Sequence, residues 1–121
     1  MTDTLKVGIA SYEDMKARTI GIARGTIKAG VDDPKIWFSS LESLAKVLSA
    51  RNQALLELIA QEKPQSLTEL EAMSGRAKSN LSRTLRTMER YGLVELSRGS
   101  DRKIMPRVPY KRIQLDMPIA G

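Results

Sequence analysis

The stretch KSNLSRTLRTMERYGLV, residues 78–94, has the pattern of a single helix with two unlike faces. At ~100° per residue, one side carries apolar residues at spacings i, i+4 and i+7: Leu81, Leu85 and Met88. The opposite side carries arginines at spacings i, i+3 and i+7: Arg83, Arg86 and Arg90. A helix that only closed a core would need no more than a soluble outer face. The row of arginines therefore indicates a further role for this side.

The composition argues against several classes of function. The chain has 121 residues, no cysteine and no histidine, so it lacks thiolate chemistry and the usual general base and metal ligand. Its acidic pairs, at 13–14 and 32–33, fit a helix start and a turn. We therefore expect no enzyme, no metal site and no cofactor. With no apolar run of ~18 residues and no signal-peptide pattern, the chain is expected to be cytoplasmic, with no membrane partner.

The positive charge of the chain is unevenly placed. Its net charge is +6, yet residues 1–75 hold nine Lys and Arg against ten Asp and Glu. Residues 76–121 hold eleven against four, so the whole excess lies in the C-terminal part. A nearly neutral N-terminal part and a basic C-terminal part suggest that the C-terminal part binds a polyanion. A solvated basic surface would give the same distribution of charge.

The first half of the chain alternates between strand and helix patterns. LKVGIA (5–10) predicts a short strand, and Ser11 opens a helix that we expect to run from 12 to 29 and to end at Gly30. KIWFSS (35–40) predicts a second strand, or an apolar lead into a helix capped by Ser39 or Ser40. Apolar spacing predicts a further helix over 51–63, before Pro64.

Residues 66–117 have the layout of a winged helix. Ser66 and Glu69 form a capping box that opens a short helix, and Gly75 ends it. The helix with the arginine row follows after a tight turn and ends at Gly92, which is a helix-turn-helix arrangement. LVELSR (93–98) and RKIM (102–105), joined by turn residues, predict a hairpin, and KRIQLDM (111–117) alternates once more. We predict a mostly helical α+β fold: a winged helix-turn-helix with an N-terminal strand and helix extension.

The row of arginines fits the major groove of DNA, which admits one α-helix. Residues near the start of such a helix usually reach the bases, where Arg can read guanine and Asn can read adenine. We expect base contacts from Ser79, Asn80 and Arg83, flanked by Ser82 and Thr87. We expect phosphate contacts from the two helix starts and the rest of the row: Ser66, Thr68, Lys78, Arg86 and Arg90. The hairpin tip, about 97–103, would lie on the backbone or in the minor groove through Arg98, Arg102 and Lys103.

The same residues have simpler explanations. Arg83, Arg86 and Arg90 could form a solvated face that pairs with Glu89 or nearby acids. The charges at 102–103 could simply keep an edge strand from pairing with another chain. Ala77 cannot cap the helix by its side chain. Either Ser79 caps this helix one turn later, or the helix start is uncapped and Ser79 is free to meet a base.

Residues 64–116 resemble the winged helix-turn-helix regulators of the MarR and ArsR kind. The resemblance rests on the segments SLTELEAMSG, SNLSRTLRTMERYGLVEL and PYKRIQLDM. Within the second, ERYGLV at 89–94 matches the pattern ExxGLV, which is common where a recognition helix meets the wing. Through SYEDMK, PKIWFSSLESLAKVLS and QSLTEL, nearly the whole chain is similar to a smaller prokaryotic group of predicted DNA-binding regulators, some of them antitoxin-like. The resemblance implies an N-terminal element, 1–38, for dimerisation or partner binding, and a DNA-binding domain, 39–121.

Together these features predict a homodimeric, sequence-specific regulator of transcription that binds double-stranded DNA and catalyses no reaction. We expect it to act as a repressor, with its own gene among the targets. The runner-up is an antitoxin that uses the same DNA-binding part and also binds a toxin protein. A protein-interaction module that has lost DNA binding, and an RNA-binding protein, are further alternatives. Charge reversal at Arg83 and Arg86 tests the interaction module, which predicts unchanged function. Direct competition between duplex DNA and RNA tests the RNA-binding alternative.

Overall fold

The structure, a computed structural model, describes residues 3–28, 30, 33–99, 101 and 103–119. The chain forms two compact units. The sheet unit consists of Met1–Lys46 and Arg112–Gly121, and the winged-helix unit consists of Val47–Lys111. This division differs from the predicted one at 38/39, because the last strand of the chain belongs with the N-terminal segment.

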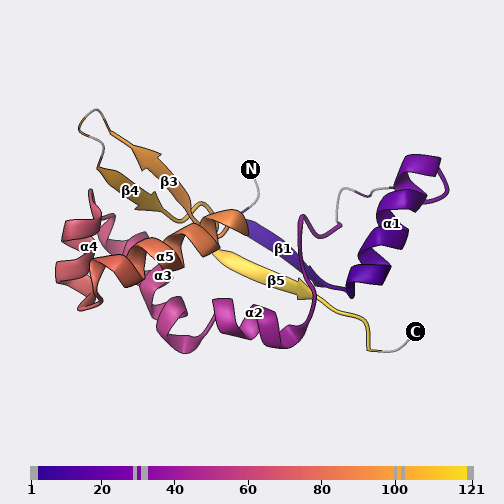
Figure 1. The fold of residues 1–121 in the computed structure, drawn as a ribbon, viewed down its shortest axis with the longest axis horizontal. Coiled ribbons are helices and arrows are strands. Elements are labelled where there is room, and N and C mark those ends of the chain that lie inside the picture. The colour runs from indigo at the N-terminus through magenta and orange to yellow at the C-terminus, as the bar shows by residue number, and fades with distance from the viewer. Residues whose placement is uncertain (1–2, 29, 31–32, 100, 102, 120–121) are drawn as a thin grey trace. The chain divides into compact units, whose positions relative to one another are not determined.

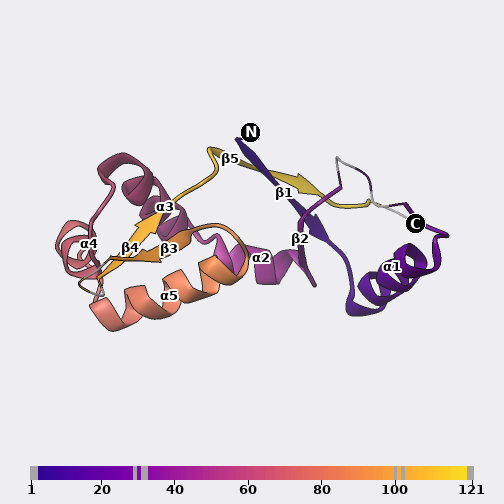
Figure 2. The same cartoon turned by 90° about the horizontal axis from the view of Figure 1, so that it is seen from above.

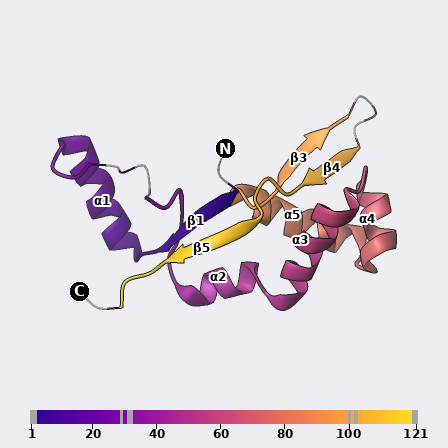
Figure 3. The same ribbon diagram turned by 180° about the vertical axis from the view of Figure 1, so that it is seen from behind.

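Three parallel strands build the sheet unit, in the order β2-β1-β5. They are β1 (Thr4–Ile9), β2 (Ile36–Phe38) and β5 (Arg112–Asp116). Figure 1 labels β1 and β5 of this sheet. Both predicted N-terminal strands are therefore present. In the register of β1 with β5, Leu5 lies beside Ile113 and Val7 beside Leu115, so these four residues share one face of the sheet. Figure 3 shows β1 and β5 running side by side.

Two helices accompany the sheet, α1 (Tyr12–Arg24) and α2 (Leu41–Val47). The expectation that the first helix runs to residue 29 was wrong. Gly25 adopts a left-handed conformation, with φ of 78°, and its N–H bonds back to the carbonyls of Gly21 and Ile22. This C-cap ends the helix at Arg24, whereas residue 29 lies outside the described residues. Ser40, one of the two predicted capping residues, precedes α2, and its Oγ accepts the N–H of Ser43 at 3.1 Å.

The opposite face of the sheet carries a stack of side chains over Gly8. A Cβ atom at Gly8 would lie 2.5 Å from two ring carbons of Trp37, so the indole ring rests directly on this part of β1. The guanidinium of Arg18, from α1, lies 5.7 Å from the centroid of that ring and is ion-paired with Asp33. The hydrogen bonds from the Gly30 N–H and from Arg18 hold the pKa of Asp33 below its usual value.

The winged-helix unit contains the helices α3, α4 and α5 and a hairpin, all labelled in Figure 2. They are α3 (Ala50–Glu62), α4 (Leu67–Ser74) and α5 (Lys78–Arg90), followed by β3 (Glu95–Arg98) and β4 (Ile104–Arg107). The antiparallel register pairs Leu96 with Pro106, so the wing includes a proline within its second strand. The core of the unit is aliphatic and includes Leu55, Ile59, Leu70, Leu81, Leu85, Met88, Leu93 and Val94.

This arrangement confirms the predicted fold class: a mostly helical α+β protein with a winged helix-turn-helix and an N-terminal strand and helix extension. Gly75 ends α4 in a left-handed conformation, as its position in the turn predicted. Gly92, with φ of 75°, follows α5 in the same region of backbone space. None of the described helices has the length and apolar character needed to cross a membrane.

Candidate nucleic-acid interface

The helix α5 keeps the two faces that its sequence predicted. Leu81, Leu85 and Met88 are buried in the core of the winged-helix unit. On the other side, Ser79, Arg83, Arg86 and Arg90 are exposed and fall within an arc of about 60° at ~100° per residue. Within the described part of the chain, none of these arginines takes part in an ion pair. We call these three arginines the arginine row; their charge faces solvent without a protein partner there.

The start of α5 is capped by a carboxylate rather than by its own N-cap residue. Ala77 occupies the N-cap position and makes no side-chain hydrogen bond. Instead, Oε2 of Glu71, from α4, accepts the N–H of Lys78 at 2.9 Å. A negative charge at a helix N-terminus interacts favourably with the helix dipole. Ser79 makes no hydrogen bond to any described residue through its side chain, so its hydroxyl is available to a ligand.

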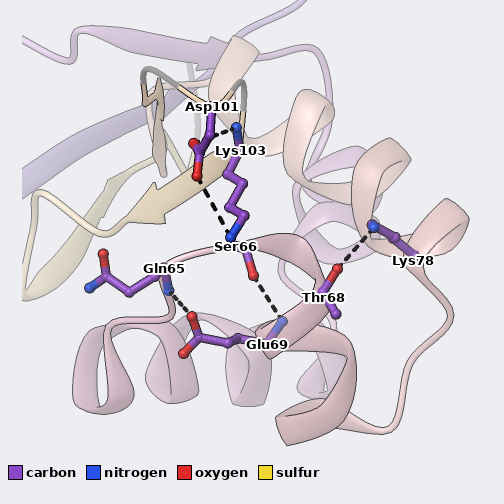
Figure 4. Close-up of polar contacts among 7 residues, drawn as sticks. All are labelled: Gln65, Ser66, Thr68, Glu69, Lys78, Asp101 and Lys103. Atoms are coloured by element: carbon purple, nitrogen blue, oxygen red, sulfur yellow. Dashed lines mark hydrogen bonds and ion pairs between the residues drawn. The ribbon is translucent and has the colours of Figure 1, made fainter.

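The ammonium group of Lys78 ties the two helices of the motif together. Its Nζ donates to Oγ1 of Thr68 at 3.0 Å, as Figure 4 shows. Both residues are exposed, so this contact holds them side by side on the surface. Two predicted phosphate contacts are thus adjacent in space although they come from different helices.

Ser66 has a structural role at the start of α4. It is buried, and its Oγ accepts the N–H of Glu69 at 3.1 Å (Figure 4). The carboxylate of Glu69 in turn accepts the N–H of Gln65 at 3.2 Å. This is the predicted capping box, except that the return bond goes to the residue before the N-cap. With its oxygen engaged and its surface covered, Ser66 is a weaker candidate for phosphate than Thr68.

Arg76 is a buried cation in the turn between α4 and α5, and sequence reasoning missed it. It is 8% exposed. Its Nη1 donates to Oδ1 of Asn52 at 3.0 Å, and its Nη2 donates to Oγ1 of Thr84 at 3.1 Å. Its Nε and Nη2 both donate to Oδ1 of Asn80, at 2.9 and 2.7 Å. Burial lowers the pKa of Arg76, from an ordinary value so high that the group stays charged near neutral pH.

These contacts change what Asn80 can offer to DNA. Asn80 is half-buried, and its only side-chain acceptor already receives two hydrogen bonds from Arg76. Reading adenine through two hydrogen bonds requires Asn to accept as well as donate. In this arrangement Asn80 keeps its amide N–H groups for a ligand, while its oxygen holds the turn in place.

A small cavity lies between α5 and the wing. Its volume is about 190 Å³. Apolar side chains of Leu67, Leu85, Leu96 and Ile104 line it together with Ser82, Arg86, Glu89 and Arg98. The cavity brings Arg86 of the arginine row and Arg98 of the wing to one place, so helix and wing present positive charge together. Ser82 is half-buried here, on the flank of the row.

The rest of the wing tip is only partly described. Lys103 is exposed, and its Nζ lies 3.6 Å from Oδ2 of Asp101, whose other oxygen accepts the N–H of Lys103 at 3.2 Å (Figure 4). That backbone bond keeps the pKa of Asp101 below its usual value. Arg102, a predicted contact, lies outside the described residues. On α5, the hydroxyl of Thr87 donates to the carbonyl of Arg83 at 3.2 Å and so points along the helix.

The chemistry of this surface follows from the side chains that it exposes. Among the residues that the structure describes, no group of three or more His, Cys, Asp or Glu is placed to hold a metal ion. Apart from the carboxylate of Glu89, the exposed polar groups on α5 are hydroxyl and amide groups and fixed positive charges. Such groups suit phosphate and base edges.

Comparison with known proteins gives a family and one solved structure. The model of the family HVO_A0114 matches residues 47–115, more than half of the chain. A search among curated proteins found no match. A solved structure described as "Crystal structure of the predicted DNA-binding transcriptional regulator from E. coli" is 18% identical, with a TM-score of 0.49. The similarity covers 84% of this chain and 86% of that one.

Proposed function

The chain belongs to the HVO_A0114 family, and from the unpaired arginine row of α5 we propose that it is a regulator of transcription that binds specific double-stranded DNA. The observation that carries the proposal is the contrast between the two faces of this helix. One face is buried in the core, and the other holds three exposed arginines without an acidic partner among the described residues. A duplex supplies the missing negative charge.

The geometry supports α5 as the recognition helix. Its exposed row is narrow enough to enter a major groove, which accepts a helix of this diameter. Arg83 and Ser79 lie in the first half of α5, where side chains usually meet base edges. Arg83 can donate two hydrogen bonds to guanine, and Ser79 has a free hydroxyl. Asn80 contributes through its amide N–H groups only.

Phosphate contacts come from the remainder of the surface. Arg86 and Arg98 line one cavity between helix and wing, and Arg90 at the end of α5 and Lys103 in the wing are exposed as well. If these four residues each neutralise one phosphate, log K falls against log salt with a slope of about −3.6, roughly a tenfold loss per doubling of salt. These contacts fix the position of the protein on the duplex without reading its sequence.

Acting as a homodimer, the protein would place two such helices in successive major grooves about one helical turn apart. Occupancy of a promoter, including that of its own gene, would then block transcription. This makes repression and autoregulation the simplest form of the proposed function.

Fluorescence anisotropy tests the proposal with labelled duplex from upstream of the gene, a scrambled duplex of equal composition, and a series of salt concentrations. Arg83→Ala should weaken binding to the native duplex about 10- to 100-fold, which corresponds to losing one bidentate base contact. Arg24→Ala removes an equal charge from α1 and serves as the matched control, with an expected change below about twofold. Equal affinity for both duplexes would contradict the sequence-specific part of the proposal. No binding to either duplex at low salt would overturn the proposal.

A second candidate, an antitoxin that also binds a toxin protein, draws support from the surface of α1. Its aromatic and aliphatic residues are exposed, Tyr12 at 78% and Ile20 and Ile22 near two-fifths. Copurification of a second protein with the full chain from its native host, lost in Tyr12→Asp/Ile20→Asp, would favour this candidate. A chain that purifies alone while repressing its own promoter would count against it.

A further inference from the structure

The outer edge of β5 is open. In the order β2-β1-β5, the strand β5 pairs with β1 on one side, and no described strand lies on its other side. All five of its residues, Arg112–Asp116, are exposed. An edge of this kind presents unpaired backbone donors and acceptors, which can pair with another strand.

The side chains of β5 extend an apolar face beyond the part that the chain itself covers. Ile113 and Leu115 lie on the same face as Leu5 and Val7 of β1. Leu5 and Val7 are buried, whereas Ile113 is 37% exposed and Leu115 42% exposed. The apolar face therefore ends half-covered at β5. Another strand beside β5 would continue this face and cover it further.

The sequence of β5 is complementary to itself in the antiparallel direction. When two copies of RIQLD are paired about Gln114, Arg112 of each copy lies opposite Asp116 of the other, and Ile113 lies opposite Leu115. Opposite charges and apolar pairs placed across from each other both stabilise antiparallel strands. The same alignment places the two Gln114 residues opposite each other, on either side of the two-fold axis.

We propose that β5 pairs antiparallel with β5 of a second copy of the chain, so that two three-stranded sheets join into one of six strands. A two-fold contact of this kind uses the same patch on both copies and closes after two subunits. Both charge pairs and both apolar pairs are satisfied at once, which a strand of unrelated sequence would not achieve. The proposal goes beyond DNA binding and does not depend on it.

Disulfide trapping tests the register, because the chain has no cysteine of its own. In Gln114→Cys the two Cα atoms would lie about 4.5–5.5 Å apart, within the range that a disulfide spans. In Arg112→Cys the equivalent atoms would lie four residues apart along the strands, about 14 Å, which is too far. Mild oxidation of the full chain should therefore crosslink most of the first variant and little of the second. Equal crosslinking of both, or crosslinking of neither, would overturn the proposed register.

A charge exchange tests the same contact without cysteine. By sedimentation, Arg112→Asp should weaken dimerisation at least tenfold, because it sets like charges opposite each other at both ends of the strand pair. The double variant Arg112→Asp/Asp116→Arg should restore dimerisation to within about twofold of the wild type. Within one chain the β1 neighbours of these two positions are Thr4 and Gly8, which carry no charge, and the exchange leaves the net charge of the chain unchanged.

Two results of these experiments would overturn the β5–β5 dimer. A wild-type chain that sediments at the 13.5 kDa of one copy at all concentrations overturns the proposal. So does a dimer that Arg112→Asp leaves intact, since its interface would then lie elsewhere. The emission of Trp37, the only tryptophan, reports in each variant whether the sheet unit is folded, because its ring rests on Gly8 of β1. Specific binding to duplex DNA by a wild-type chain that stays monomeric would leave DNA binding standing while the dimer proposal fails.

Discussion

Replacing Arg76 by methionine should lower the stability of the winged-helix unit. Methionine keeps much of the length and apolar stem of arginine but removes its five donors. In the structure those donors join Asn52 of α3 to Asn80 and Thr84 of α5 through four hydrogen bonds of 2.7–3.1 Å. The substitution therefore separates the turn of the motif from both helices that it holds together.

The size of the effect follows from the acceptors and their surroundings. A hydrogen bond to a charged group contributes about 1.5–3 kcal/mol to stability. Taking about 1.5 kcal/mol for each of the three acceptors gives a total of about 4.5 kcal/mol before any cost is subtracted. Two terms reduce this value. Burial of the guanidinium has a cost, which its lowered pKa reflects, and methionine avoids that cost. Asn80, Asn52 and Thr84 are only half-buried, so water can replace part of the lost bonding. We expect a loss of about 2 kcal/mol.

Thermal unfolding followed by circular dichroism measures this loss. For a unit of this size, about 2 kcal/mol corresponds to a fall in Tm of roughly 8–16 °C. Arg86→Met makes the same chemical change on the exposed side of α5 and is the matched control, with an expected shift within about 0.5 kcal/mol of the wild type. If the two variants melt at the same temperature, the buried hydrogen bonds of Arg76 do not stabilise the fold and the reasoning is refuted.

Three further substitutions test separate features of the structure. Ala77→Ser should stabilise α5 by about 1 kcal/mol in chemical denaturation, because Glu71 caps only the first N–H of the helix and a serine could accept a later one; an unchanged midpoint would contradict this. Gly8→Ala should destabilise the sheet unit by about 1–3 kcal/mol and shift the emission of Trp37, since its Cβ would lie 2.5 Å from the indole ring; a wild-type spectrum and midpoint would show that the ring has room to move. Gly75→Ala should lower the midpoint by only about 1–2 kcal/mol, because φ is +72° but no atom lies within 4 Å of the new Cβ; a larger loss would reveal a clash.

Local patterns predicted the winged-helix unit well because each of its elements is defined by nearby residues. The two faces of α5, the capping box at Ser66 and the stop at Gly75 all depend on spacings within one helix. The end of α1 was misplaced because Gly21, Gly25 and Gly30 are all compatible with a stop. Backbone hydrogen bonds from the left-handed Gly25 decide among them, and no local pattern contains that information.

The features that the sequence did not reveal depend on residues far apart in the chain. β5 was expected as an alternating segment, but its parallel partner β1 lies at the other end of the described chain. Arg76 gave no signal, because Asn52 and Thr84 become its partners only after α3 and α5 have packed. For the same reason Asn80 looked free to read a base. Whether the predicted site residues contact DNA is a question for the binding experiments above.

The pairing of β1 with β5 also sets an order of events during synthesis. β1 is made first, yet its neighbour β5 follows about a hundred residues later, after the whole winged-helix unit. That unit contains all of its own elements between Val47 and Lys111, so it can fold on the ribosome while β1 has β2 on one side but still lacks β5 on the other. The long loop between the two strands makes their pairing a late and slow step. A nascent chain thus completes its arginine-bearing helix before it completes the sheet.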